Sequence, residues 1–221
     1  MLSVVYPPTY YAYNFESQVN VVARRGKAWI DGRKMNGILA RLTTAPRTYL
    51  DVGCGDGRFL RDMERRGLTR GSLYGLELDA RVAGALAADG YQVSCDRVET
   101  CNTVPLAGVD LATMFHVIEH VSDPGAVLSR LADWLAPAGI LALETPNLDS
   151  LDARLFRRTY WGGYHFPRHW HLFTPATLIR LLERCGFDVE SVGYQTGHSF
   201  WMYSVHHALK YSRRSKVQWM A

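Results

Sequence analysis

The chain has 221 residues, of which 48% are hydrophobic and 21% charged, the balance of a globular protein that can bury a core. A net charge of +4 is too small to call for nucleic acid or a membrane as partner. The sequence lacks an apolar run of about 18 residues and a basic start followed by an apolar segment, so we expect no transmembrane segment and no export signal. The four cysteines form no Cys-x-x-Cys pair and no zinc-finger spacing, which favours reduced cysteines in the cytoplasm.

Residues 1–45 are expected to form an N-terminal lid and helices. The aromatic, proline-bearing residues 1–14 predict an extended start, whose tyrosines either cover a ligand or pack on the core. Apolar residues then recur at helical spacing, with Gly26 and Gly32 as expected breaks, so we predict two helices before the first strand. Their basic residues are interpreted as a solvated face: Arg24, Arg25, Lys27, Arg33 and Lys34.

A glycine-rich turn follows the first predicted strand, in the stretch Tyr49-Leu-Asp-Val-Gly-Cys-Gly-Asp-Gly-Arg-Phe-Leu60. Gly53, Gly55 and Gly57 let the chain turn sharply and bring backbone close to a ligand. The turn leads into a helix N-terminus, where free N–H groups favour an anion, and Asp51 adds a negative charge beside it. Such a pocket suits a zwitterion, whereas a dinucleotide turn has the pattern Gly-x-Gly-x-x-Gly, which is absent.

The next predicted strand, Ser72–Asp79, contains two acids near its end. In doubly wound nucleotide folds an acid about 20 residues beyond the glycine turn binds a ribose diol, and Glu77 occupies this position. Asp79 is expected to cap the following helix, because Asp is a favoured N-cap residue. The alternative interpretation is that both are solvated turn acids.

Strands and helices alternate along the rest of the chain, which predicts an α/β fold with a doubly wound, mostly parallel sheet and ligands at the carboxyl ends of its strands. Further strands are predicted at Tyr91–Cys95, Val109–Met114, Gly139–Glu144 and Phe187–Tyr194. Helices are predicted at 58–66, 80–89, 124–135, 150–158, 175–185 and 199–212. We therefore expect a core over residues 46–198 and a C-terminal helix with a basic tail over residues 199–221.

Two motifs in this sequence resemble those of class I S-adenosylmethionine (SAM) dependent methyltransferases. Asp-x-Gly-x-Gly-x-Gly is similar to their motif I. Phe115-His-Val-Ile-Glu-His-Val-Ser-Asp-Pro124 is similar to the segment after the fourth strand of bacterial small-molecule methyltransferases, including ubiquinone-biosynthesis O-methyltransferases. The resemblance implies a Rossmann-like fold, SAM as cofactor and S-adenosylhomocysteine (SAH) as product. It also implies a seventh strand, for which no residues remain before the C-terminus, so we expect the last strand to be missing or replaced.

The resemblance carries over to individual SAM-binding positions. It implies that Phe115 and His116 line the methionine half of SAM. It also implies that Asp96 approaches the adenine amino group, with an ordinary turn acid as the alternative. The candidate cofactor-binding residues are Asp51, Gly53, Cys54, Gly55, Gly57, Glu77, Leu78, Asp96, Phe115 and His116.

A metal-binding interpretation exists for the same segment. His116-x-x-Glu119-His120 spells an inverted zinc-protease pattern, which requires both histidines on one helix and a third ligand downstream. Some ubiquinone O-methyltransferases use a Glu-x-x-Glu-His cluster here for a divalent ion, and this chain has histidine in the first position. We therefore expect no metal, with Glu119 and His120 hydrogen-bonded within the fold.

The expected acceptor loop, residues 145–174, includes an irregular stretch, Tyr160–Thr174, with three histidines, six aromatic residues and an arginine. Long irregular segments inside compact domains are usually functional. The resemblance implies that this loop overhangs the acceptor pocket, where rings would hold a planar or apolar acceptor, histidine would act as base and arginine would bind an acidic group. A tightly packed structural loop is the alternative. The candidate catalytic residues are His165, Arg168, His169 and His171.

We therefore expect a SAM-dependent methyltransferase of small molecules, with O-methylation favoured over N- or C-methylation. An RNA methyltransferase is one alternative, although the modest net charge makes nucleic acid an unfavoured partner. A non-catalytic module on the same fold, bound to a partner through the aromatic C-terminal helix, is another. That helix could also form a homodimer or touch a membrane surface, but we favour packing on the domain.

Overall fold

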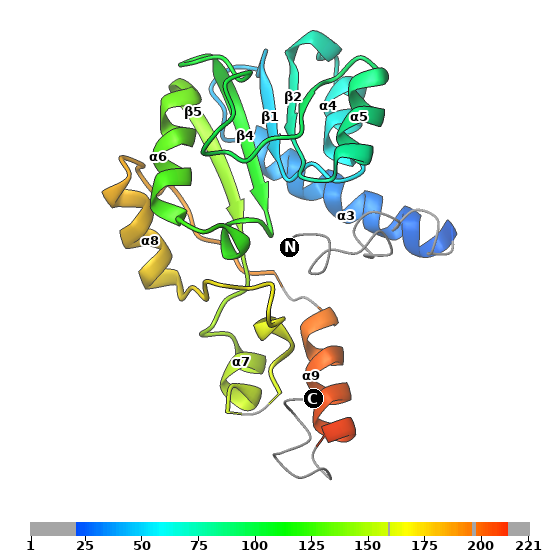
Figure 1. The fold of residues 1–221 in the computed structure, drawn as a ribbon, viewed down its shortest axis with the longest axis vertical. Coiled ribbons are helices and arrows are strands. Elements are labelled where there is room, and N and C mark those ends of the chain that lie inside the picture. The colour runs from blue at the N-terminus through cyan, green and yellow to red at the C-terminus, as the bar shows by residue number, and fades with distance from the viewer. Residues whose placement is uncertain (1–20, 159, 196–197, 212–221) are drawn as a thin grey trace. The chain divides into compact units, whose positions relative to one another are not determined.

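The computed structural model describes residues 21–158, 160–195 and 198–211 (Figure 1). The chain divides into two compact units. The first unit comprises Met1–Val117 and Ala126–Glu144, and the second comprises Ile118–Gly125 and Thr145–Ala221. The N-terminal tyrosines expected to form a lid, and the basic C-terminal tail, lie outside the described residues.

The first unit is built on a five-stranded sheet with the order β3-β2-β1-β4-β5, and every neighbouring pair is parallel. The strands are β1 (Tyr49–Val52), β2 (Leu73–Leu76), β3 (Gln92–Ser94), β4 (Val109–Phe115) and β5 (Leu135–Glu144). The predicted doubly wound α/β fold is therefore confirmed. Strand order reverses between β1 and β4, which is where open α/β sheets bind ligands.

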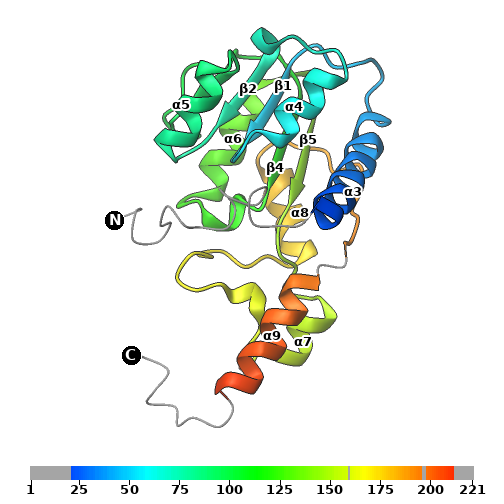
Figure 2. The same cartoon turned by 90° about the vertical axis from the view of Figure 1, so that its right-hand side faces the viewer.

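Helices cover both faces of this sheet. The order steps one way from β1 to β3 and the other way from β4 to β5, so right-handed crossovers put the connecting helices on opposite faces. Accordingly α4 and α5 lie on one face and α6 on the other (Figures 1 and 2). Their bounds are α4 Arg58–Arg65, α5 Ala80–Ala88 and α6 Pro124–Trp134, close to those predicted.

The region before β1 corrects one expectation. A single helix, α3 (Val21–Leu39), runs through both Gly26 and Gly32, where breaks were predicted. Glycine inside a helix costs about 1 kcal/mol relative to alanine, a preference that tertiary packing readily overrides. Met35 is fully buried in the core of the first unit, and this packing anchors the C-terminal part of α3.

Capping signals in the sequence are confirmed. Asp79 Oδ1 accepts hydrogen bonds from the backbone N–H groups of Arg81 (2.9 Å) and Val82 (3.2 Å) at the start of α5. Thr174 forms a reciprocal capping box with Thr177 at the start of α8 (Pro175–Arg184).

The second unit contains α7 (Leu151–Phe156), α8 and α9 (His198–Tyr211), together with the short 3-10 helices η3 (Ile118–His120) and η4 (Gly162–Tyr164). The predicted C-terminal aromatic helix is confirmed as α9, and it packs within this unit. Gly162 N–H donates to Ser204 Oγ at 2.8 Å, and a Cβ at Gly162 would lie 2.8 Å from the Phe200 carbonyl oxygen. No helix among the described residues has the length and apolar character required to cross a membrane.

The sixth strand expected at Phe187–Tyr194 is wrong. These residues do not form a strand, although residues 187–190 alternate between half-buried and exposed as the pattern suggested. A strand needs a neighbour for its N–H and C=O groups, and side-chain alternation by itself does not provide one.

Candidate active site

The glycine turn sits at the carboxyl end of β1 and is tied to the end of β2. The N–H groups of Gly53 and Cys54 both donate to the carbonyl oxygen of Leu76, at 2.8 and 3.0 Å. Gly53 has a φ of +72°, and a Cβ there would lie 2.4 Å from Val117 Cγ2. Both the left-handed backbone and the close approach exclude a larger residue.

Glu77 connects this turn to the start of α5. Its carboxyl group accepts hydrogen bonds from Gly55 N–H at 2.9 Å and from Asp79 N–H at 3.0 Å. Burial raises the pKa of Glu77 above its usual value, and these backbone hydrogen bonds oppose the shift. Glu77 therefore holds the two segments together.

Asp51 lies on β1, inside the sheet. The sequence predicts that it adds a negative charge beside the glycine turn, but its buried surroundings change its protonation. Its side chain is 3% exposed, and Oδ1 accepts a hydrogen bond from Thr113 Oγ1 on β4 at 2.8 Å. Burial raises the pKa of Asp51 to about 7, although the Thr113 hydrogen bond acts against the shift. Near neutral pH both protonation states are therefore populated, and a positive charge beside Asp51 would favour the carboxylate.

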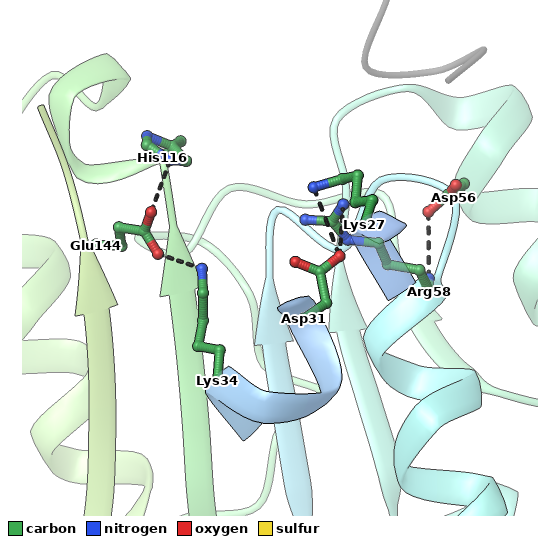
Figure 3. Close-up of polar contacts among 7 residues, drawn as sticks. All are labelled: Lys27, Asp31, Lys34, Asp56, Arg58, His116 and Glu144. Carbon is green, nitrogen blue, oxygen red and sulfur yellow. Dashed lines mark hydrogen bonds and ion pairs between the residues drawn. The ribbon is translucent and has the colours of Figure 1, made fainter. Parts of the chain in front are cut away.

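The ends of β4 and β5 carry a second group of polar side chains, drawn in Figure 3. His116 Nε2 lies 3.2 Å from Glu144 Oε1, and Lys34 on α3 donates a hydrogen bond to the other carboxylate oxygen of Glu144. Burial acts to raise the pKa of Glu144, but the bonds and charges of His116 and Lys34 outweigh it and lower the pKa to about 2. The Lys34 ammonium also lies 4.3 Å from the centre of the Phe115 ring.

A third group, also in Figure 3, joins α3 to the start of α4. Asp31 pairs with Lys27 at 3.5 Å and with Arg58 at 3.2 Å. Burial and the neighbouring Arg58 charge lower the pKa of Lys27. The interpretation of the basic residues on this helix as a solvated face is therefore wrong for Lys34, which reaches Glu144 at the end of β5, and for Lys27, which is half-buried and pairs with Asp31 of the same helix.

The remaining candidates have less specific surroundings. Cys54 is buried, and this burial raises the pKa of its thiol. Leu78 is 48% exposed and Asp96 is also exposed, so both present side chains to solvent just beyond β2 and β3.

The candidate catalytic loop belongs to the second unit, where it is fastened to η3. The carbonyl oxygen of Glu119 accepts hydrogen bonds from the N–H groups of Trp170 (2.8 Å) and His171 (3.1 Å). The Glu119 carboxylate is 1% exposed and accepts a hydrogen bond from Thr145 Oγ1 at 2.9 Å.

Two histidines of this unit are held by backbone carbonyls. His120 Nδ1 lies 2.9 Å from the Arg168 carbonyl oxygen, and His169 Nδ1 lies 2.7 Å from that of Gly163. A carbonyl oxygen can only accept, so Nδ1 carries the proton in both rings and the lone pair of each neutral imidazole is on Nε2. The two rings meet edge to face with centroids 4.7 Å apart.

The other loop candidates are engaged differently. Arg168 Nη1 donates to His165 Nε2 at 3.2 Å, so the lone pair of His165 is already used. Burial, followed by the charges of His169 and Arg168, lowers the pKa of His165 to about 4, which keeps it neutral at neutral pH. The ring of His171 stacks on Phe173 with centroids 6.1 Å apart.

The sequence analysis did not predict that Lys34 and Glu144 take part in the polar contacts at the carboxyl ends of β4 and β5. Glu144 had a usable signal, since it is a carboxylate at the carboxyl end of a predicted parallel strand, as Asp51 is near the end of β1. Lys34 had none, because a lysine next to a core residue on a helix is usually solvent-exposed.

The parallel sheet, with its glycine turn after β1 and its acid after β2, defines the class I SAM-dependent methyltransferase fold. The solved magnesium protoporphyrin IX methyltransferase from Synechocystis PCC 6803, with bound SAH, has this fold. It aligns with a TM-score of 0.62 and 18% identity over 83% of this chain and 84% of that one. The family model described as "Methyltransferase domain" matches residues 24–192. The chain belongs to this family, and it is a SAM-dependent methyltransferase.

Curated proteins with similar sequences carry related descriptions. A "Ubiquinone biosynthesis O-methyltransferase" of Neisseria meningitidis serogroup C is 30% identical over 168 residues, covering 69% of this chain and 68% of the relative. A "Probable S-adenosylmethionine-dependent methyltransferase" of Mycolicibacterium smegmatis is 30% identical over 153 residues, covering 66% of this chain and 54% of the relative.

Proposed function

We propose that this methyltransferase transfers the SAM methyl group to a hydroxyl group of a small, planar or apolar molecule. The observation that carries the proposal is the proton arrangement of His169. Its Nδ1 proton is held by a backbone carbonyl, which puts the lone pair of the neutral ring on Nε2, in a loop that also exposes aromatic rings. The description of the Neisseria relative as an O-methyltransferase supports the same reaction.

For the cofactor, we propose that the zwitterionic end of SAM binds at the glycine turn and that Glu77 accepts hydrogen bonds from the ribose diol. The turn fits this role, because its left-handed glycines put no side chain where a ligand would lie against the backbone. Phe115 and His116 would line the methionine half, and Leu78 and Asp96 the adenine. A SAM ammonium group beside Asp51 would hold that acid in its charged form.

For the transfer itself, the acceptor oxygen must approach the methyl carbon opposite the departing sulfur, at roughly 3 Å in a near-attack arrangement. A neutral hydroxyl is a weak nucleophile, so a positioned base contributes about 10²–10⁴-fold. We assign this role to His169 rather than His165, because burial lowers the pKa of His165 to about 4 and makes it the weaker base. Arg168 is proposed to recognise an acidic group on the acceptor, and His171 to position aromatic rings.

The proposal is tested with radiolabelled SAM and a panel of phenols, aliphatic alcohols and amines. We expect methyl transfer to oxygen, with His169→Gln lowering turnover by about 10²-fold or more and leaving SAH affinity unchanged. The matched control is His206→Gln on α9, which should retain full turnover. Methylation of nitrogen or carbon only, or full activity of His169→Gln, would contradict the assignment.

A further inference from the structure

Three side chains of the second unit bring together atoms of the kind that bind a metal ion. Glu119, His120 and His169 each offer one ligand atom, and these atoms all lie within 4.8 Å of one another. Glu119 and His120 come from η3, whereas His169 comes from the aromatic loop. The loop is held against η3 by the two backbone hydrogen bonds to the Glu119 carbonyl oxygen.

Both imidazoles are oriented as metal ligands are. Metal-binding histidines almost always donate their other ring N–H to a carbonyl, a carboxylate or water, which fixes the tautomer and the direction of the lone pair. His120 and His169 each make this bond through Nδ1, to the carbonyl oxygens of Arg168 and Gly163. The third ligand is oriented as well, because Thr145 Oγ1 donates to Oε2 of the Glu119 carboxylate.

The charge of the cluster also suits a cation. The Glu119 carboxylate is 1% exposed, and burying a carboxylate is costly unless hydrogen bonds and positive charge compensate for it. In its neutral form each imidazole beside it carries its lone pair on Nε2, so both rings can offer a donor atom to the same centre. A divalent ion would bind all three groups and compensate the buried charge.

We propose that Glu119, His120 and His169 form a site for a divalent transition metal of the zinc class. Two imidazole nitrogens and one carboxylate are a donor set typical of zinc with one coordination position open, whereas magnesium prefers oxygen ligands and water. Zinc–ligand bonds of about 2.0–2.2 Å place tetrahedral donors roughly 3.4 Å apart. The ligand atoms therefore need to close by at most about 1.4 Å around the ion, which side-chain rotation can supply.

This donor set differs from the Glu-x-x-Glu-His cluster considered from the sequence. The first position of that pattern is His116, which belongs to the first unit and bonds to Glu144 there. The third donor is instead His169, which lies far along the sequence and was considered only as a base. The proposal thus replaces the expectation that the protein uses no metal.

Metal binding at this site does not depend on the identity of the acceptor. A bound ion can lower the pKa of a hydroxyl group that reaches its open position, which is the assistance that O-methylation requires. With a metal present, His169 would serve as a ligand, and without one its Nε2 would serve as the base proposed above.

The test measures zinc binding by the whole, chelator-treated protein, using equilibrium dialysis and metal analysis, with no SAM or acceptor present. We expect about one zinc ion per chain and binding weakened at least about tenfold in His169→Gln and His120→Gln. The matched control is His171→Gln, which removes a histidine of the same loop outside the cluster and should bind zinc as the wild type does. Substituting cobalt for zinc should give the visible spectrum of a four-coordinate ion.

Three results would overturn the proposal: no zinc bound by the wild type, unchanged zinc affinity in His169→Gln, or a preference for magnesium over zinc. Thermal unfolding of each metal-free variant, followed by circular dichroism, separates a lost ligand from a lost fold, since a folded variant unfolds as the metal-free wild type does. Failure of zinc binding would leave the methyltransferase proposal intact, because the radiolabel assay tests that independently.

Discussion

Two buried acids at the strand ends, Asp51 and Glu77, have different surroundings. Asp51 bonds to a side chain of the neighbouring strand, whereas Glu77 bonds to backbone N–H groups of two separate segments. Burial raises the pKa of both, and that of Asp51 rises to about 7. Their residue type was evident in the sequence, but the number and kind of hydrogen bonds were set by the packed strands.

Asp51 is expected to make stability depend on pH. Its pKa rises from 3.8 to about 7 on folding, so between these values the folded state binds a proton that the unfolded state does not. The stability from this group is therefore present below its unfolded pKa and lost as pH rises through about 7, with a slope of at most about 1.4 kcal/mol per pH unit.

Asp51→Asn should remove this dependence. Urea unfolding at about pH 5 and about pH 8 should show a smaller fall in the free energy of unfolding for the variant than for the wild type. Asp188→Asn, at an exposed acid of the second unit, is the control and should follow the wild type. Parallel pH profiles for wild type and Asp51→Asn would show that the carboxyl keeps an ordinary pKa.

Glu77→Ala should weaken SAH binding by about 1–3 kcal/mol, the value of a hydrogen bond to a charged group. Part of the loss would come from the glycine turn, whose Gly55 N–H loses its partner. The measurement is isothermal titration with SAH, and Glu190→Ala, at an exposed acid of the second unit, serves as the control. Wild-type affinity in Glu77→Ala would remove Glu77 from the cofactor site.

Among the helices and strands, α3 differs most from what the sequence predicts. The helix supplies Asp31 and Lys34 to the two groups of Figure 3, while Met35 anchors it in the core. The region that the sequence analysis interprets as two helices thus lies alongside the candidate cofactor residue Phe115 of β4 and the start of α4.

Lys34→Met should destabilise the protein by about 1–3 kcal/mol, because it removes a charge-assisted hydrogen bond to a mostly buried carboxylate. Arg33→Met, on the exposed side of the same helix, should stay within about 0.5 kcal/mol of the wild type. Denaturant unfolding of the two variants measures the difference. Equal stabilities would mean that the Lys34–Glu144 pair contributes nothing.

Helix ends were more predictable than strand partners. Asp79 and Thr174 cap helices through bonds to backbone two or three residues away, so short sequence windows contain the whole interaction. Residues 187–194 had the alternation of a strand but form none, because strand formation depends on a neighbour that no local pattern specifies.

For the molecule as a whole, the sequence by itself determined the α/β class, the positions of the strands in the parallel sheet together with one strand that does not form, and the glycine turn, while its resemblance to class I methyltransferases indicated the SAM-dependent chemistry. These follow from hydrophobic periodicity, turn residues and local motifs, which act over short stretches of chain. Only the tertiary structure decided that α3 is continuous, that Lys34 meets Glu144, and that His169 lies beside Glu119 and His120. Each of these depends on contacts between residues far apart in the sequence, where packing and the satisfaction of buried polar groups outweigh local preference.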